Sequence, residues 1–301
     1  WLVPLPCPFV LGACFALIGA FLSSAPPFQN AMAMDANRCG IPVVYGFCRG
    51  VGSVSYAAAV LLLGFVLERH APTLLLPVFA ALTACGLIAM AGFRLPERPD
   101  EAEDRPAERR SIAAVLRGHP RFALTLLGCT FFFLTHTISN TYMNALVGKA
   151  GGTASAVGTS LAISAVLELP AMTLVSRLQK RFSPGFFLRF AAGAEVVKFL
   201  IFYLARSMPL IYLGHCMQFF QFAVYAPATV YYVAAMLPER DQLKGQSLIY
   251  VAGSGLGGAL GNLLGGRLLD RSGIQAALLL GTVSAAASLL TFCLSTRKSS
   301  R

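Results

Sequence analysis

The sequence predicts an all-α membrane protein, and three observations support this fold class. Apolar residues make up 56% of the 301-residue chain and charged residues only 12%, about half of the roughly 25% that is typical of soluble domains. Thirteen of the 37 charged side chains lie between Arg94 and Arg121. The remainder consists largely of apolar runs long enough to cross a bilayer as helices. These features exclude a soluble enzyme, a nucleic-acid module, a disordered chain and a secreted disulfide scaffold.

Nine apolar runs predict nine transmembrane helices. They cover residues 9–33, 44–67, 72–93, 122–146, 154–176, 185–205, 208–233, 246–268 and 273–295. Gly and Pro occur inside several of these runs, and membrane helices tolerate both.

The distribution of Lys and Arg predicts the orientation. Loops on one side hold 18 basic residues, loops on the other side hold five, and Lys198 lies inside a span. Cytoplasmic loops carry the excess of basic residues. We therefore expect a multi-pass protein of the cell (inner or plasma) membrane with a cytoplasmic C-terminus. The net charge of +11 then reflects topology, and no nucleic-acid partner is expected.

An internal repeat predicts two halves. The repeated segments are Gly52-Ser53, Leu62-Leu63-Gly64 and Glu68-Arg69, which recur as Gly253-Ser254, Leu263-Leu264-Gly265 and Asp270-Arg271. Same-direction repeats of this kind build several transporter families. Spans one to three thus correspond to spans seven to nine. The chain also begins at Trp1 without a signal-peptide n-region, so we expect three further helices upstream.

The implied protein has twelve helices in two pseudo-symmetric six-helix halves. Residues 1–93 would form the last three helices of the N-terminal half, 94–121 a cytoplasmic central linker, and 122–301 the C-terminal half. Because part of the N-terminal half is absent, we expect that this chain alone does not transport.

The chain resembles the major facilitator superfamily. Besides the implied halves and linker, the resemblance rests on Tyr45-Gly46…Arg49…Gly52-Ser53 at the start of a helix and on the basic loop Arg177…Lys180-Arg181. That loop lacks the Gly and Asp usual in the family. Asn140-Thr-Tyr142-Met-Asn144 and Glu168-Leu-Pro170 look like the branch with the lactose permease and the phenylpropionate and nucleoside proton symporters. The resemblance implies a secondary carrier that works by alternating access.

Five ionisable residues lie inside predicted spans, where a charge costs at least about 2.5–3.5 kcal/mol and marks a functional candidate. They are His136, Glu168, Glu195, Lys198 and His215. Glu168 is our candidate for the titrating group, and the resemblance also implies a functional acid in its helix. Lys198 is the candidate counter-charge or substrate contact, and Glu195, one turn earlier, can pair with it. The alternatives are a neutral Glu168 held by one hydrogen bond, and a Glu195–Lys198 pair without a transport role.

Two further groups of polar residues complete the candidate pathway. The resemblance implies a histidine at His215 and an acid one turn later, where this chain has Gln218. If Gln218 replaces the coupling acid, either Glu168 or Glu195 substitutes for it or the protein is a uniporter. His136, Asn140 and Asn144 share one helix face, which fits either a cavity lining or hydrogen bonds between helices.

Four glycines predict close helix packing: Gly253, Gly257, Gly261 and Gly265 recur every four residues, a spacing that lets backbones approach. We expect such smooth faces between the moving halves. The eight cysteines show no metal-ligand spacing, so neither a metal nor a cofactor is expected.

These observations favour a secondary active transporter of a small organic solute, coupled to protons. A solute or drug efflux carrier and a uniporter of the same fold are alternatives, as is, more remotely, a membrane redox protein with haem between His136 and His215. The expected partners are the solute, H+ and the lipid bilayer, and the protein is expected to be a monomer. The chain shows no catalytic motif, so it is not expected to be an enzyme.

Overall fold

The computed structural model describes residues 45–92, 111–179 and 181–296, with scattered positions between Val10 and Ile41. Its regular secondary structure is entirely helical over these residues. The chain divides into two compact units, one of Trp1–Cys48 with His70–Arg105 and one of Arg49–Arg69 with Pro106–Arg301. The first predicted span, 9–33, is described only at scattered positions, and most of the predicted linker lies outside the described residues.

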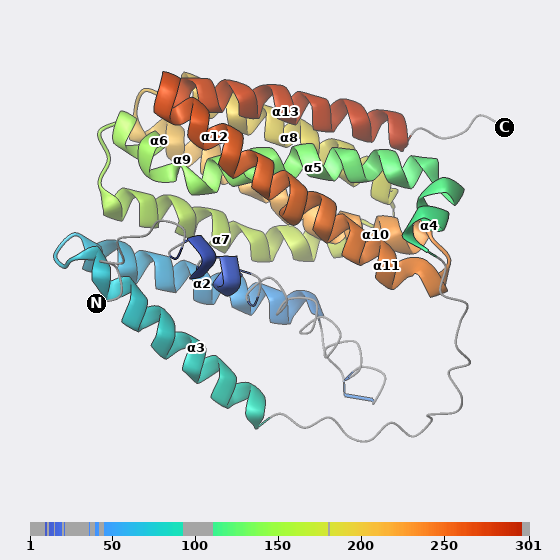
Figure 1. Cartoon of the computed structure of the whole chain (residues 1–301), viewed down its shortest axis with the longest axis horizontal. Coiled ribbons are helices and arrows are strands. Elements are labelled where there is room, and N and C mark those ends of the chain that lie inside the picture. The colour runs from blue at the N-terminus through green and yellow to red at the C-terminus, as the bar shows by residue number, and fades with distance from the viewer. Residues whose placement is uncertain are drawn as a thin grey trace. The chain divides into compact units, whose positions relative to one another are not determined.

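The first unit contains a 3-10 turn, η1 (Pro72–Leu74), that leads into α3 (Leu75–Ala91). The second unit contains nearly all of α2 (Tyr45–Leu67). It also holds the C-terminal helices. Those labelled in Figure 1 are α4 (Ile112–Gly118), α5 (Pro120–Thr141), α6 (Met143–Lys149), α7 (Ala154–Leu178), α8 (Pro184–Leu204), α9 (Met208–Cys216), α10 (Phe222–Met236), α11 (Glu239–Tyr250), α12 (Gly258–Ser272) and α13 (Ile274–Ser295), and two short segments, η2 (Met217–Phe219) and η3 (Val251–Gly257), lie between them. The contacts of α2 therefore place it with the C-terminal helices.

Helices occupy each predicted span within the described residues, but three of those spans are interrupted. The span 122–146 breaks at Tyr142 into α5 and α6. The span 208–233 is α9, a 3-10 turn and α10, and the span 246–268 contains a π-helical segment between α11 and α12. The π segment has the sequence Val-Ala-Gly-Ser-Gly-Leu-Gly, where glycines lower the preference for a regular α-helix.

Five helical stretches in the described residues are long and apolar enough to cross a membrane: Pro120–Thr141, Ala154–Val175, Met208–Met236, Asp241–Ser272 and Ile274–Ser295. Helix α8 has 21 residues, which is sufficient length, but it carries Arg189, Glu195 and Lys198. Its start is well defined, because Pro184 occupies the first turn and the Ser183 side chain accepts a hydrogen bond from the Phe186 amide at 3.3 Å.

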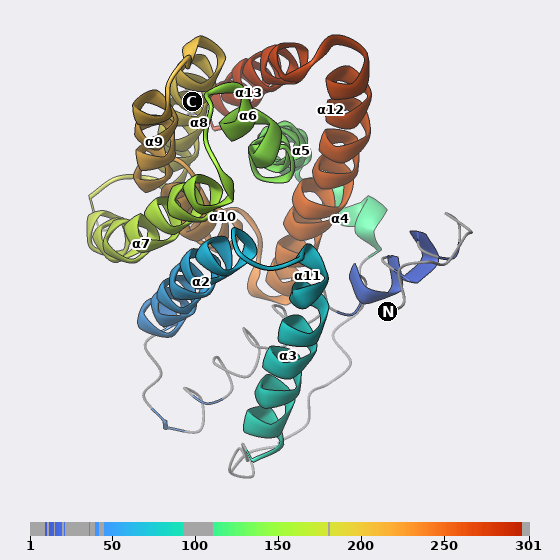
Figure 2. The same ribbon diagram turned by 90° about the vertical axis from the view of Figure 1, so that its left-hand side faces the viewer.

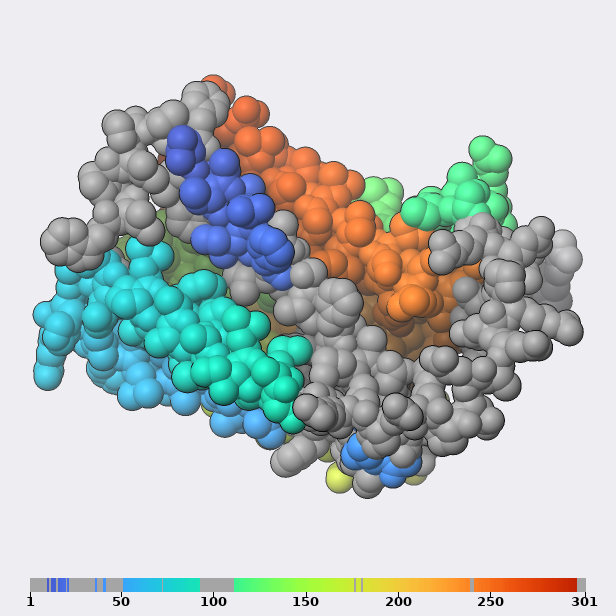
Figure 3. Space-filling view, turned by 60° about the horizontal axis from the view of Figure 1, so that its bottom comes forward, coloured from blue at the N-terminus to red at the C-terminus, as the bar shows by residue number. Residues whose placement is uncertain are grey.

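Large apolar side chains cover the outer faces of the helices in the second unit. On η3 and α12, which form the orange surface in Figure 3, Val251, Leu256 and Leu263 are each at least half exposed. Leu204 of α8 and Val283 of α13 are exposed to a similar degree. Exposed apolar area on this scale is uncommon on soluble monomers, and it fits contact with lipid.

The interior of the second unit has two apolar clusters with a polar layer between them. One cluster includes Phe187 and Leu188 of α8 with Val224 and Val233 of α10, and the other includes Phe199 and Phe202 of α8 with Ile211 of α9. In Figure 2, which looks along the helices, α5 lies near the middle with α12 beside it, and α13 packs on both α5 and α8. The stretch of α8 left between the clusters contains Glu195 and Lys198.

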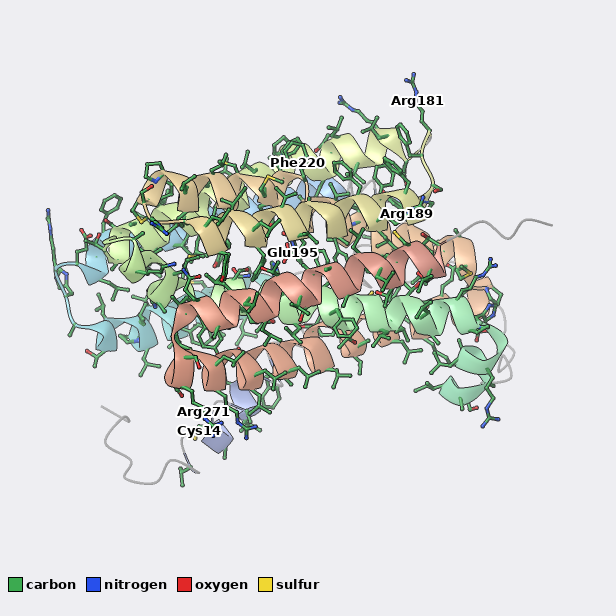
Figure 4. All side chains as sticks on the ribbon, turned by 90° about the horizontal axis from the view of Figure 1, so that it is seen from above. Cys14, Arg181, Arg189, Glu195, Phe220 and Arg271 are labelled. Carbon is green, nitrogen blue, oxygen red and sulfur yellow. The ribbon has the colours of Figure 1, made fainter. Side chains whose placement is uncertain are left out.

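Basic residues from the two predicted sides of the membrane lie at opposite ends of the bundle. Figure 4 shows Arg181 and Arg189 at one end and Arg271 at the other, with Glu195 between them along the bundle. This separation agrees with the alternation of sides that the basic residues predict.

Candidate functional site

A chain of hydrogen bonds joins three of the predicted site residues in the polar layer. Lys198 Nζ on α8 donates to Gln218 Oε1 at 3.2 Å, and Gln218 Nε2 donates to Glu168 Oε1 on α7 at 3.1 Å. Lys198 is 1% exposed and Gln218 5% exposed, whereas Glu168 is half-buried. Lys198 Nζ also lies 5.8 Å from the ring centre of Phe202. The amide of Gln218 thus links the ammonium to the carboxylate.

Helix α2 contributes a fourth member to this chain. Ser53 Oγ donates to Glu168 Oε2 at 2.8 Å. The helices approach closely further along, where a Cβ on Gly64 would lie 3.3 Å from the Cα of Gly158. Glycine at both positions lets α2 and α7 cross at short range, and this crossing brings Ser53 to the carboxylate.

The outer end of the α2–α7 contact is held by Glu68, which follows α2 directly. Its Oε1 accepts hydrogen bonds from Thr153 Oγ1 at 2.8 Å and from the Ser155 amide at 3.3 Å. Hydrogen bonds from the side chains of Ser155 and Thr153 lower the pKa of Glu68, because they stabilise the charged carboxylate.

His215 lies in the same layer but bonds to a different residue. Its Nδ1 is 2.7 Å from Ser164 Oγ on α7, and its ring centre is 5.1 Å from that of Phe202. The histidine is 2% exposed, and its Nε2 has no hydrogen-bond partner. His215 therefore contacts α8, the helix of Lys198, through the ring of Phe202.

Glu195 is fully buried one turn before Lys198, and neither of its carboxyl oxygens has a hydrogen-bond partner. The ammonium of Lys198 bonds to Gln218. The pairing of Glu195 with Lys198 that the sequence suggests is therefore not a hydrogen-bonded one in this structure.

The polar stripe of His136, Asn140 and Asn144 divides at the break between α5 and α6. Asn140 Nδ2 donates to the His136 carbonyl at 2.8 Å and lies 3.2 Å from His136 Nε2. The His136 ring stacks on Phe222 of α10 with ring centres 4.5 Å apart. Asn144 lies on α6 and is exposed. The structure thus brings His136 and Asn140 together and leaves Asn144 apart.

The glycine ladder packs against α5. A Cβ at Gly253 would lie 2.7 Å from the Phe133 ring, one at Gly261 2.7 Å from the Leu134 carbonyl oxygen, and one at Gly265 2.6 Å from the Tyr142 ring. A Cβ at Gly257 would collide with the Thr130 carbonyl oxygen. We expected such a face between the two halves, but these contacts lie within the C-terminal helices, because η3 and α12 pack directly on α5.

Three residues of the polar layer were not predicted as site residues from the sequence. Ser53 drew notice only as part of the repeat, and Ser164 not at all, because serine is common in membrane helices and carries no charge. Gln221 is fully buried, and neither polar atom of its side chain has a hydrogen-bond partner. Its position one turn after Gln218 could have identified it. In the described part of the chain, no group of three or more His, Cys, Asp or Glu residues could hold a metal ion.

Comparisons with known proteins agree with this architecture. Residues 9–280 match the model of the MFS_1 like family. The maltose permease of Geobacillus stearothermophilus is 28% identical over 92% of this chain and 69% of the permease. The transporter YwbF of Bacillus subtilis is 23% identical over 95% of this chain and 70% of its own length.

Solved structures of the transporter FucP share the fold. The outward conformation gives a TM-score of 0.54 at 19% identity, over 77% of this chain and 60% of FucP. The N162A form of the Escherichia coli fucose:proton symporter gives 0.57 at 17% identity, over 93% of this chain and 74% of the symporter. This chain thus spans about two thirds of the length of its relatives. They are transporters rather than enzymes, which agrees with the predicted function and leaves the haem protein without support. The chain belongs to the MFS_1 like family, and it is an all-α membrane transporter of the major facilitator type.

Proposed function

We propose that the protein moves a small polyhydroxylated solute, a sugar or a close analogue, together with protons by alternating access. The buried polar layer carries this proposal, because a solute rich in hydroxyl groups needs donors and acceptors away from lipid. The similar proteins support the solute class, since one is a maltose permease and another, which has the same fold as this chain, is a fucose:proton symporter.

Glu168 is the proposed proton carrier. It is half-buried, and it accepts hydrogen bonds from Ser53 and Gln218, which hold the carboxylate in place. Protonation of Oε1 would remove the acceptor that Gln218 Nε2 uses, so Gln218 would then have to change partners. Because Gln218 also accepts a hydrogen bond from Lys198, protonation of Glu168 would alter the hydrogen bonding of the Lys198 ammonium. Lys198 and His215 are proposed to face the solute, with His136 and Asn140 on the α5 side and Asn144 nearer the end of the pathway.

The remaining expectations about the whole transporter are proposals as well. They comprise two six-helix halves joined by the charged segment 94–121, a monomer in the cell membrane, and a cytoplasmic C-terminus. Their support is the sequence repeat and the excess of basic residues on one set of loops, with Arg181 and Arg271 at opposite ends of the bundle.

The test is Glu168→Gln in the full-length transporter, reconstituted in vesicles with an imposed pH gradient. Proton-driven accumulation of a labelled maltose or fucose should be lost, while exchange of the same sugar across the membrane continues, because the amide mimics the protonated acid. Glu68→Gln is the matched control at the outer end of the same helix contact, and it should accumulate normally. Undiminished accumulation in Glu168→Gln would refute the assignment, and wild-type uptake that ignores the pH gradient would favour the uniporter.

A further inference from the structure

A second group of interior polar atoms lies beside the Glu168–Gln218–Lys198 chain and takes no part in it. Glu195 and Gln221 are each 0% exposed, and all four polar atoms of their side chains lack a hydrogen-bond partner. A buried polar group without a partner costs about 1–3 kcal/mol, and more when it is charged. If Glu195 and Gln221 lie close together, their unpartnered polar atoms indicate a binding site for a ligand.

The helix register brings these two residues to the same level. Helix α8 runs antiparallel to α9 and α10, with Phe202 against Gly214 and Lys198 bonded to Gln218. One turn before Lys198 on α8 and one turn after Gln218 along the chain, the same register sets Glu195 opposite Gln221. Both residues therefore lie one helix turn from the Lys198–Gln218 hydrogen bond, within the same polar layer.

Helix α13 supplies a third oxygen at this level. It also runs antiparallel to α8, because Gly281 lies against Phe199 and Gly185 lies against Thr296. The same register brings Ser284, which is buried, to the level of Glu195. Two carboxyl oxygens, an amide oxygen and a hydroxyl oxygen can thus converge from three helices.

The helix opposite Glu195 is discontinuous at this point. After the 3-10 turn η2, Gln221 has backbone angles of −102° and −94°, outside the helical region, before α10 begins at Phe222. Discontinuous membrane helices are the usual place for coupling-ion sites in transporters, because carbonyl groups at the break are available as ligands.

The charges of the interior favour a cation as the occupant. When ionised, Glu168 and Glu195 carry two negative charges against the single positive charge of Lys198. One monovalent cation at Glu195 would balance them. Oxygen atoms are also the ligands that hard cations prefer.

We propose that Glu195, Gln221 and Ser284 form a binding site for one monovalent cation, either Na+ or a proton carried on a Glu195 oxygen. The occupancy of this site does not depend on the proposed function. Its role in coupling does, since it acts on the pathway through Lys198, one turn away on α8.

Other titratable groups lie on the helices around this region. They are Lys198 on α8, His215 on α9, Tyr225 on α10, and His136 and Cys129 on α5, whereas α13 contains no charged residue or histidine. The test therefore compares variants at Glu195 with variants at Glu168, so that a response from the other groups appears in both.

The experiment measures the full-length purified transporter without solute. Thermal unfolding is followed in NaCl against choline chloride at constant ionic strength, and the infrared band of protonated carboxyl groups is followed against pH. If Na+ occupies the site, saturating Na+ should raise Tm by about 5 °C in the wild type. The rise should be absent in Glu195→Gln and kept in Glu168→Gln. If the proton occupies it, Na+ has no effect, and a carboxyl band that titrates with pH is lost in Glu195→Gln alone.

Gln221→Leu tests the site without changing the acid. It should shift the Na+ midpoint by about tenfold, or the midpoint of the carboxyl band by about one pH unit, whereas Gln246→Leu near the end of α11 should shift neither. If Glu195→Gln does not fold, an unchanged midpoint in Gln221→Leu overturns the proposal.

Two other results also overturn it. One is a wild-type carboxyl band that persists at every pH and ignores Na+, because Glu195 is then permanently neutral. The other is a cation response that Glu168→Gln abolishes and Glu195→Gln keeps, which would leave the proposed function standing. Conversely, undiminished accumulation in Glu168→Gln with a cation response lost in Glu195→Gln would remove the proposed function and keep this site.

Discussion

Ser53 and Glu168 are 115 positions apart in the sequence, yet the hydroxyl of Ser53 donates to Glu168 Oε2 at 2.8 Å. This bond ties α2 to the C-terminal helices at the residue proposed to carry the proton. The carboxylate thus depends on a donor from a helix on the other side of the predicted linker.

Ser53→Ala removes that donor without adding bulk. Proton-driven accumulation should fall several-fold, because a hydrogen bond to a charged group is worth about 1.5–3 kcal/mol and the carboxylate would be less well positioned. Uptake into vesicles measures the effect. Ser55→Ala is the matched control, since Ser55 Oγ bonds to the Val51 carbonyl of its own helix. Equal uptake by the two variants would show that the Ser53 bond has no role in transport.

Gln218→Leu should impair both transport and stability. It leaves Lys198 Nζ and Glu168 Oε1 without the amide that joins them, at a cost of about 1–3 kcal/mol for each buried group left unpaired. We expect at least a tenfold loss of accumulation together with a lower Tm in detergent. Gln246→Leu should change neither, since Gln246 bonds to the Val230 carbonyl at an exposed position. Normal accumulation by Gln218→Leu would show that the Gln218 amide has no role in transport.

Gly257→Ala should destabilise the protein by about 1–3 kcal/mol, the usual cost of overpacking. The added methyl would collide with the Thr130 carbonyl oxygen, and the backbone of α5 cannot turn aside as a flexible side chain can. Gly255→Ala is the control in the same π-helical segment, where a Cβ meets nothing within 4 Å. Thermal unfolding in detergent compares the two, and equal Tm values would contradict the packing seen here.

Glu68 predicts a pH dependence at the outer end of the α2–α7 contact. Its pKa is lowered from 4.5 in the folded protein, so its contribution to stability is complete above about pH 4.5 and is lost as the pH falls through the folded value. Wild type should therefore have a higher Tm than Glu68→Gln near neutral pH, and the difference should vanish in acid. Thr153→Val removes one of the donors to Glu68, so the Tm difference between wild type and Thr153→Val near neutral pH should be smaller than that between wild type and Glu68→Gln. A gap between wild type and Glu68→Gln that is constant with pH would exclude the carboxylate as its cause.

The spans were predictable because each depends on its own residues. A run of about 20 apolar residues must bury its backbone hydrogen bonds within itself to cross lipid, and α7, α8 and α13 accordingly lie where the sequence places them. The breaks at Tyr142 and at Gln221 were not predictable, because no proline marks either position and both depend on packing against neighbouring helices. The two six-helix halves remain a prediction from the repeat.

The sequence by itself determined the membrane fold, the helices and the small set of interior residues that are costly in lipid, since hydropathy and charge are properties of each segment. Only the tertiary structure decided which of those residues meet. Gln218 joins Lys198 to Glu168, Ser164 bonds to His215, and Glu195 and Gln221 are buried without hydrogen-bond partners. These contacts depend on the rotation and register of each helix against its neighbours, and packing over the whole bundle sets both.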